Sequence, residues 1–200
     1  MFTATRPRGL NRTNHDESRE RRGPAFTAAE LLRDDTTTWM SIWHEGKLVV
    51  AQGRWRLYWE LSRISPSGVT GATGSGETVS DPVLDDIAQR AVMAIDKHPQ
   101  GLFGVDLAYD KDGTPNPTEI NIGRLFTTHQ FFTELGLNMP YIFTKLAYGE
   151  KLPHISKRLN PARNRMFWIR GMDFEPILVS MADISKEEAR LDAVKRELTT

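Results

Sequence analysis

The sequence predicts an α+β protein, built as a mainly antiparallel β-sheet with helices packed on one face. Residues 36–61 are rich in β-branched and aromatic side chains, apolar and polar residues alternate in residues 101–122, and turn residues interrupt both stretches. Between these two predicted hairpins, residues 82–95 carry apolar side chains at helical spacing. We therefore expect two hairpins in one sheet, with the helix packed on it.

The composition of the whole chain limits the classes of function. Its 200 residues suggest one domain with room for tails. The 26 basic residues equal the 26 acidic ones, so no global charge attracts nucleic acid or an acidic membrane. The absence of cysteine excludes disulfides and thiolate metal sites. With no apolar run long enough for a membrane span and no signal-peptide core, we expect a cytoplasmic protein.

Residues 1–24 differ in composition from the rest of the chain. Six arginines stand against three acids, and few apolar residues are present to anchor the segment. We predict a disordered or connecting tail. A basic nucleic-acid arm and an organelle transit peptide are the alternatives, and the three acids weaken both.

The first predicted hairpin contains strands at 36–43 and 48–61, joined by a turn at 45–47. Arg54, Arg56 and Glu60 share one face of the second strand by alternation. That face is either a solvated surface with an ion pair or a binding surface. The apolar side chains of this hairpin are expected to supply much of the aromatic core: Trp39, Ile42, Trp43, Leu48, Val50, Trp55, Leu57, Tyr58 and Trp59.

A stretch rich in glycine and hydroxyl residues, 65–78, follows the first hairpin. A flexible surface loop is the simplest interpretation, and a backbone-amide cradle for an anion is the other. It is not a Walker A loop, because no Gly-Lys-Ser/Thr follows. Ser80, Asp81 and Pro82 then begin the predicted helix, and Pro99 ends it.

The second predicted hairpin carries the residues best suited to chemistry. Its alternation places Glu119 and Asn121 on one side of the returning strand, where Asp106 of the first strand can approach them. Two carboxylates and an amide oxygen are hard donors that suit Mg²⁺. The alternative is a solvated polar face, which hairpins commonly have.

The rest of the chain is predicted to form short elements. Helices are expected at 126–135 and 141–148, a strand pair at 166–170 and 174–179, and a charged helix at 185–198. His129 is interpreted as a packed or surface histidine.

The order Asp106, Glu119, Asn121 and Arg124 resembles the metal-binding end of the ATP-grasp family, in its carbamoyl-phosphate-synthase-like branch. Residues 136–140 and 146–153 continue the resemblance, which covers roughly residues 25–153. Arg124 lies three residues after Asn121, where many members have two.

The resemblance implies a fold and an activity. It implies the C-terminal subdomain of an ATP-grasp domain at 25–153, followed by an extension at 154–200. Such ligases use ATP and Mg²⁺, with Mn²⁺ as an alternative ion, to phosphorylate a carboxylate that an amine then attacks. By the resemblance, Asp106, Glu119 and Asn121 hold metal, Arg54 and Arg56 join the two carboxylates in binding the nucleotide, and Arg56 and Arg124 act in catalysis.

The resemblance also implies that one of the two lobes of an ATP-grasp site is missing from this sequence. An ATP-grasp site lies between two lobes, and the first lysine of this chain is Lys47, in a turn. We expect either that the chain is a fragment of a longer protein or that a separate polypeptide supplies the lobe with the nucleotide-gripping lysines. The chain alone is expected to bind Mg-ATP weakly or not at all and to show no turnover. The rival hypothesis is a non-catalytic remnant or partner-binding domain. An arginine-rich nucleic-acid binder is the weakest option, and no membrane partner is expected.

Overall fold

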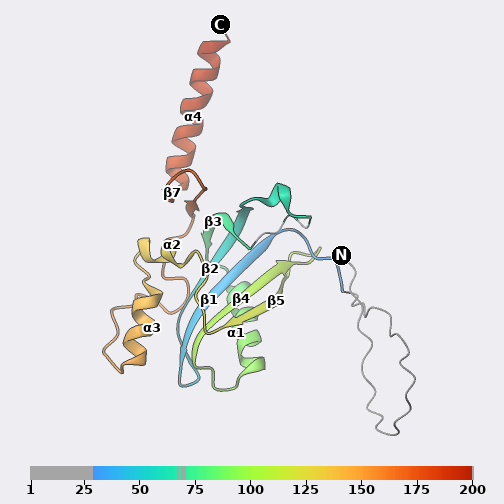
Figure 1. The fold of residues 1–200 in the computed structure, drawn as a ribbon. Helices are drawn as coiled ribbons and strands as arrows, with labels where there is room; N and C mark the ends of the chain where they lie inside the picture. The colour runs from blue at the N-terminus through green and yellow to red at the C-terminus, as the bar shows by residue number, and fades with distance from the viewer. Residues whose placement is uncertain (1–28, 67, 69–70, 200) are drawn as a thin grey trace, which may run out of the picture.

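The computed structural model describes residues 29–66, 68 and 71–199, so the predicted tail at 1–24 lies outside the described residues. A seven-stranded antiparallel sheet forms the body, in the order β5-β4-β1-β2-β3-β6-β7 (Figure 1). The strands are β1 (Thr36–His44), β2 (Lys47–Trp59), β3 (Thr73–Val79), β4 (Gly101–Tyr109), β5 (Pro115–Ile122), β6 (Met166–Ile169) and β7 (Ile177–Ser180). The helices are α1 (Pro82–Ile95), α2 (His129–Glu134), α3 (Met139–Ala147) and α4 (Met181–Leu198). The predicted α+β class with an antiparallel sheet is confirmed.

Strand β1 joins the two predicted hairpins into one sheet. It pairs with β2 through a tight turn at Glu45 and Gly46, which both have positive φ. On its other side it pairs with β4, although 56 residues separate His44 from Gly101 in the sequence numbering. The second hairpin, β4–β5, thereby extends the sheet of the first.

The helices cover both faces of the sheet, which differs from the expectation that they pack on one. Trp39 and Trp43 point to the face that α1 covers with Leu84, Ala88 and Val92. The alternate residues Met40 and Ile42 point to the opposite face, where α2 and α3 pack. The difference arises because β1 is apolar at successive positions, so both of its faces must be buried.

The glycine-rich stretch is only partly a loop. Its second half forms β3, which pairs with β2 and β6, whereas 65–78 was expected to be a surface loop. A side chain at Gly76 would lie 3.1 Å from Cδ of Arg54. Glycine therefore leaves room here for a large side chain of the neighbouring strand.

Asp85 of α1 fastens the segment after α3 to the sheet. Its buried carboxylate accepts hydrogen bonds from the Trp39 indole and the Asn160 amide, both at 2.8 Å. The side-chain oxygen of Asn160 in turn accepts a 2.8 Å hydrogen bond from the backbone N–H of Gly53. Next to it, Leu159 forms an isolated parallel β-bridge with Ala51. Burial raises the pKa of Asp85, and the hydrogen bonds from its two neutral donors offset this increase only in part.

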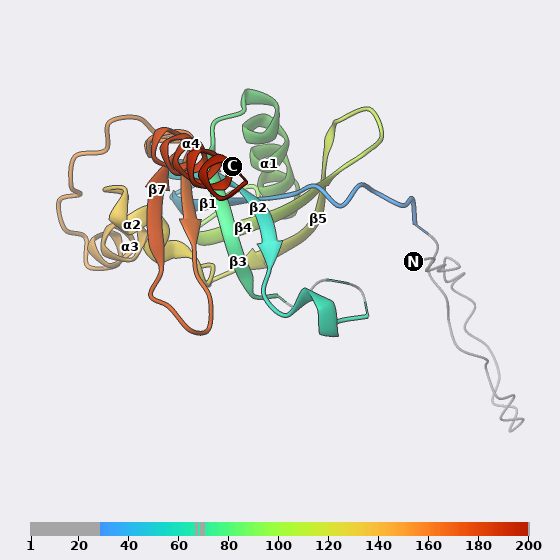
Figure 2. The same ribbon diagram turned by 90° about the horizontal axis from the view of Figure 1, so that it is seen from above.

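The C-terminal part continues the same sheet. β6 pairs with β3 and β7 pairs with β6, close to the strand pair predicted from the sequence. α4 follows β7 and projects away from the body, as seen by comparing Figures 1 and 2. Within the described ranges, no helix is long and apolar enough to cross a membrane.

Candidate functional site

One row of residues runs across four neighbouring strands and defines the site. Thr38 of β1 pairs with Arg54 on one side and with Asp106 on the other. Asp106 pairs in turn with Glu119 of β5. Directly opposed residues of antiparallel strands point to the same face, so the arginine and both carboxylates share a face. The packing of Met40, two residues along β1, identifies it as the face of α2 and α3.

A cavity of about 300 Å³ opens above this row. All six residues that the sequence singled out as site candidates line it, although they come from β2, β4, β5 and the segment after β5. The full lining is Arg54, Arg56, Trp59, Gly71, Thr73, Asp106, Glu119, Asn121, Arg124, Leu125, Phe126 and Thr127. The sheet therefore gathers basic groups and oxygen donors into one space.

Arg54 forms the floor of the cavity. Its side chain is 2% exposed, and within the described residues its Nε and Nη1 atoms have no hydrogen-bond partner. Its guanidinium lies 5.7 Å from the centre of the Phe126 ring. Burial, reinforced by the neighbouring charge of Arg56, lowers the pKa of Arg54 to about 9. A buried cation without a full set of partners is costly, so this position favours the approach of an anion.

Arg56 joins the basic side of the cavity to the acidic side. Its Nη2 donates to Oδ1 of Asp106 at 2.5 Å, and the two side chains are only 12% and 13% exposed. The guanidinium also lies 4.8 Å from the centre of the Trp59 ring. These contacts fix the position of Arg56 from two directions.

Trp59 and its two neighbours were predicted to lie in the core, but the structure places them elsewhere. Trp59 lines the cavity instead of the core, and Leu57 and Tyr58 are about half exposed. The pairing of β2 with β3 shifts register after Arg56, and this irregularity interrupts the alternation that had placed these residues inside.

Arg124 lies at the rim, where it holds the amide of Asn121. Its Nε donates to Asn121 Oδ1 at 2.9 Å, and its Nη2 donates to the same oxygen. The same Nη2 lies 4.0 Å from Oε1 of Glu119, with both side chains more than half exposed. The extra residue between Asn121 and Arg124 does not prevent Arg124 from reaching the donor set.

The donor chemistry at this site fits Mg²⁺. Asp106, Glu119 and Asn121 present hard oxygen atoms on adjacent strands of one face. In the part of the chain that the structure describes, no group of three or more His, Asp or Glu side chains is placed to hold a metal. Mg²⁺ has six coordination positions, so two carboxylates and an amide leave some of them for phosphate oxygens or water. Protein-bound Mg²⁺ usually completes its coordination in this way.

Phe126 is a site residue that the sequence patterns did not identify. A side chain at Gly104, in the middle of β4, would come within 2.7 Å of the Phe126 ring. The glycine thus lets the tip of the ring approach the backbone of β4, where the ring packs against the core and lies near Arg54. A glycine inside a predicted strand was the available signal for such a close approach.

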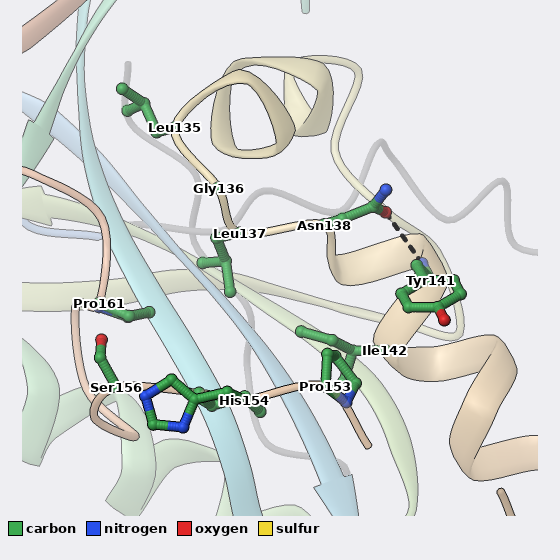
Figure 3. Close-up of a pocket in the computed structure, with 11 residues that line it drawn as sticks. Leu135, Gly136, Leu137, Asn138, Tyr141, Ile142, Pro153, His154, Ser156 and Pro161 are labelled. Carbon is green, nitrogen blue, oxygen red and sulfur yellow. Dashed lines mark hydrogen bonds between the residues drawn. The ribbon is translucent and has the colours of Figure 1, made fainter. Parts of the chain in front are cut away.

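A second cavity, of about 350 Å³, lies between the α2–α3 connection and residues 153–161 (Figure 3). Leu137, Ile142 and Pro161 give it apolar walls. Asn138 accepts a 3.0 Å hydrogen bond from the backbone N–H of Tyr141, drawn as a dashed line, and so caps α3. None of the six candidate residues lines this cavity. We therefore assign it to the packing of α3 and not to the candidate site.

Fold and site together define an antiparallel α+β protein with a cavity that brings arginine side chains and oxygen donors together. No family model and no curated protein matches this chain. Its fold is similar to part of an L-amino acid ligase from Bacillus licheniformis, at 18% identity and a TM-score of 0.48, covering 69% of this chain and 35% of that one. It is also similar to a protein from Archaeoglobus fulgidus described as belonging to the ATP-grasp superfamily, at 17% identity and a TM-score of 0.47, covering 76% of this chain and 47% of that one. This chain thus spans about a third and about half of the two proteins.

Proposed function

We propose that this chain is the metal- and phosphate-binding part of an ATP-dependent ligase. The ligase would activate a carboxylate as an acyl phosphate, which an amine then attacks. The observation that carries the proposal is the buried guanidinium of Arg54, which lies in the same cavity as Asp106 and Glu119. A site with a buried cation on one side and hard oxygen donors on the other suits a phosphate that is bound together with a divalent metal.

The arginines are assigned to the transferred phosphoryl group. A guanidinium presents planar, paired donors that match phosphate oxygens, and Arg54 still has donor atoms to offer within the described part of the chain. Arg56 and Arg124 lie at the side and the rim of the cavity, where they can reach the same anion. Phosphoryl transfer depends chiefly on position and charge, so no general base is required of this chain.

Asp106, Glu119 and Asn121 are assigned to Mg²⁺, with Mn²⁺ as an alternative ion. The metal would neutralise phosphate charge when it is bound. Arg56 and Arg124 now donate to Asp106 and Asn121, so they hold the oxygen donors in place. If metal takes these oxygens, both guanidinium groups become available to phosphate. The chain's own residues would thereby couple metal binding to phosphate binding.

The lysines that reach the α- and β-phosphates, and the hinge that holds adenine, are assigned to another lobe. Of the described residues, no lysine lines the candidate cavity. The carbamoyl-phosphate-synthase-like branch, the domain boundaries at 24/25 and 153/154 and the cytoplasmic location remain predictions. A non-catalytic remnant is the alternative function.

Isothermal titration with inorganic tripolyphosphate, with and without Mg²⁺, tests the proposal. We expect Mg²⁺ to strengthen binding to the wild type, and Glu119→Gln to remove the Mg²⁺ dependence. Asp112→Asn, an acid-to-amide change in the β4–β5 turn outside the cavity, is the matched control and should behave as wild type. Polyphosphate binding that is absent, or independent of Mg²⁺ in the wild type, would favour the non-catalytic alternative.

A further inference from the structure

Helix α4 extends away from the sheet (Figures 1 and 2). It also carries exposed apolar side chains. Leu191, Val194 and Leu198 are 55%, 45% and 81% exposed, whereas Ile184, one turn from the helix start, is half-buried. A well-formed cap begins the helix, since Ser180 and Asp183 bond each other's backbone N–H groups. Such a capped, polar helix with a few large exposed apolar groups suggests contact with another chain.

The apolar residues follow the spacing of a coiled-coil seam. Ile184, Leu191 and Leu198 are seven residues apart, and Val194 lies three after Leu191. In heptad terms, the first three occupy a positions and Val194 occupies a d position. The remaining d position holds Glu187. The residues that flank the seam are charged: Glu188 and Lys195 at e positions, and Arg190 and Glu197 at g positions.

The flanking charges distinguish between the two possible orientations of a helix pair. In a parallel pair, a g residue faces the e residue five positions later on the partner. Arg190 would then face the partner's Lys195, and Asp183 the partner's Glu188, so both contacts would be repulsive.

In an antiparallel pair, g faces g and e faces e. Arg190 would face the partner's Glu197, and Glu188 would face the partner's Lys195. Two-fold symmetry repeats each contact, so all four flanking pairs are of opposite charge. Within the helix, Arg190 already contacts Glu187 at 3.3 Å and Lys195 contacts Asp192 at 3.8 Å, but these are exposed ion pairs that rearrange at little cost.

We propose that two copies of this chain associate through an antiparallel pair of α4 helices. Leu191 of each copy packs on the partner's Val194, and these two layers flank the two-fold axis. Leu198 covers the aliphatic part of the partner's Glu187 at each end of the seam. Because α4 projects from the body, the two sheets lie at opposite ends of the pair (Figure 1). This association goes beyond the proposed ligase function and does not depend on it.

The contact is small, so the dimer is weak and depends on protein concentration. The helix has 18 residues and the seam has only two fully apolar layers. Sedimentation velocity should show a monomer–dimer equilibrium in the range of about 10–500 μM, as expected for an interface below the usual size of stable ones. A monomer throughout this range would overturn the proposal.

Charge reversal tests the pairing. Arg190→Glu should weaken the dimer by about tenfold or more, since it sets like charges against each other twice. The double variant Arg190→Glu/Glu197→Arg restores opposite charges and should return to within about threefold of wild type. Arg196→Glu, a reversal on the outer side of the same helix, is the matched control and should leave dimerisation unchanged. Failure of the double variant to recover, with a normal helix content by circular dichroism, would contradict the proposal.

Cysteine pairing tests the orientation, because the natural chain has no cysteine. In the antiparallel pair, residue 187 lies opposite the partner's residue 198 and about 16 Å from the partner's residue 187. In a glutathione buffer, Glu187→Cys chains mixed with Leu198→Cys chains should form the mixed disulfide, and each variant alone should not. A disulfide between two Glu187→Cys chains would instead indicate a parallel pair and would overturn the proposal.

Discussion

The guanidinium of Arg56 donates a 2.5 Å hydrogen bond to Oδ1 of Asp106, across the intervening strand β1. The contact joins the strand that carries the arginines to the strand that carries the metal-ligand candidate. Because both side chains are largely buried, salt and water screen this pair less than an exposed ion pair. It also means that any ligand that binds Asp106 or Arg56 competes with this contact.

Replacing the buried guanidinium should separate binding from stability. We expect Arg54→Met to abolish polyphosphate binding while raising the melting temperature by a few degrees, because a buried charge is removed and the apolar stem is kept. Differential scanning fluorimetry with and without polyphosphate measures both effects. Arg90→Met, on the exposed surface of α1, is the control. A large loss of stability in Arg54→Met would show instead that the arginine holds the fold together.

Removing the charge of the carboxylate at the rim should affect metal and leave the fold intact. Glu119 is 62% exposed, so Glu119→Gln should change the free energy of unfolding by less than about 0.5 kcal/mol. Mn²⁺ binding, followed by water proton relaxation, should fall at least about tenfold because a carboxylate ligand becomes a neutral amide. Unchanged Mn²⁺ affinity would remove Glu119 from the metal site.

A lysine at position 56 should keep the positive charge but lose the planar, paired donors of the guanidinium. Arg56→Lys can still reach toward Asp106, but it lacks the paired donors and the flat contact with Trp59. We expect polyphosphate affinity to drop about tenfold, with the melting temperature within a few degrees of wild type. Calorimetry measures the affinity, and Arg90→Lys controls for the substitution itself. A stability loss with full affinity would identify Arg56 as a structural residue.

The buried carboxylate of Asp85, in α1, should make the free energy of unfolding depend on pH. Burial raises the pKa of Asp85 above its ordinary value of 3.8, so the folded protein binds this proton more tightly than the unfolded chain. The stabilisation from proton binding is fully present below that ordinary value and is lost as pH rises through the folded-state pKa. Urea unfolding of wild type and Asp85→Ala at several values from about pH 4 to 7 measures it. The stability advantage of wild type should shrink as pH rises, and an advantage that grows would contradict the raised pKa.

Local pattern was enough to predict the second hairpin and to place Glu119 and Asn121 on one side of its returning strand. That Asp106 lies opposite Glu119 depends on a register shift between Asp106 and Leu107, because the register next to the turn would pair Asp106 with Thr118 instead. Local pattern also found the α1 cap at Asp81, whose carboxylate accepts from Val83. It failed at Leu57 and Tyr58, because a register shift after Arg56 depends on the pairing with β3, which sequence periodicity does not reveal.

The sequence by itself determined the residue types of the site, the α+β class and the charge pattern of α4, because each of these follows from short-range spacing. Only the tertiary structure decided that β1 lies between Arg54 and Asp106, that helices cover both faces and that Arg54 is buried. Alternation assigns a side chain to a face of a strand, but its depth depends on which distant strands and rings pack beside it. Arg54 reads from the sequence as one more charged strand residue, and it is the pairing of β1 and the ring of Phe126 that turn it into the floor of a cavity.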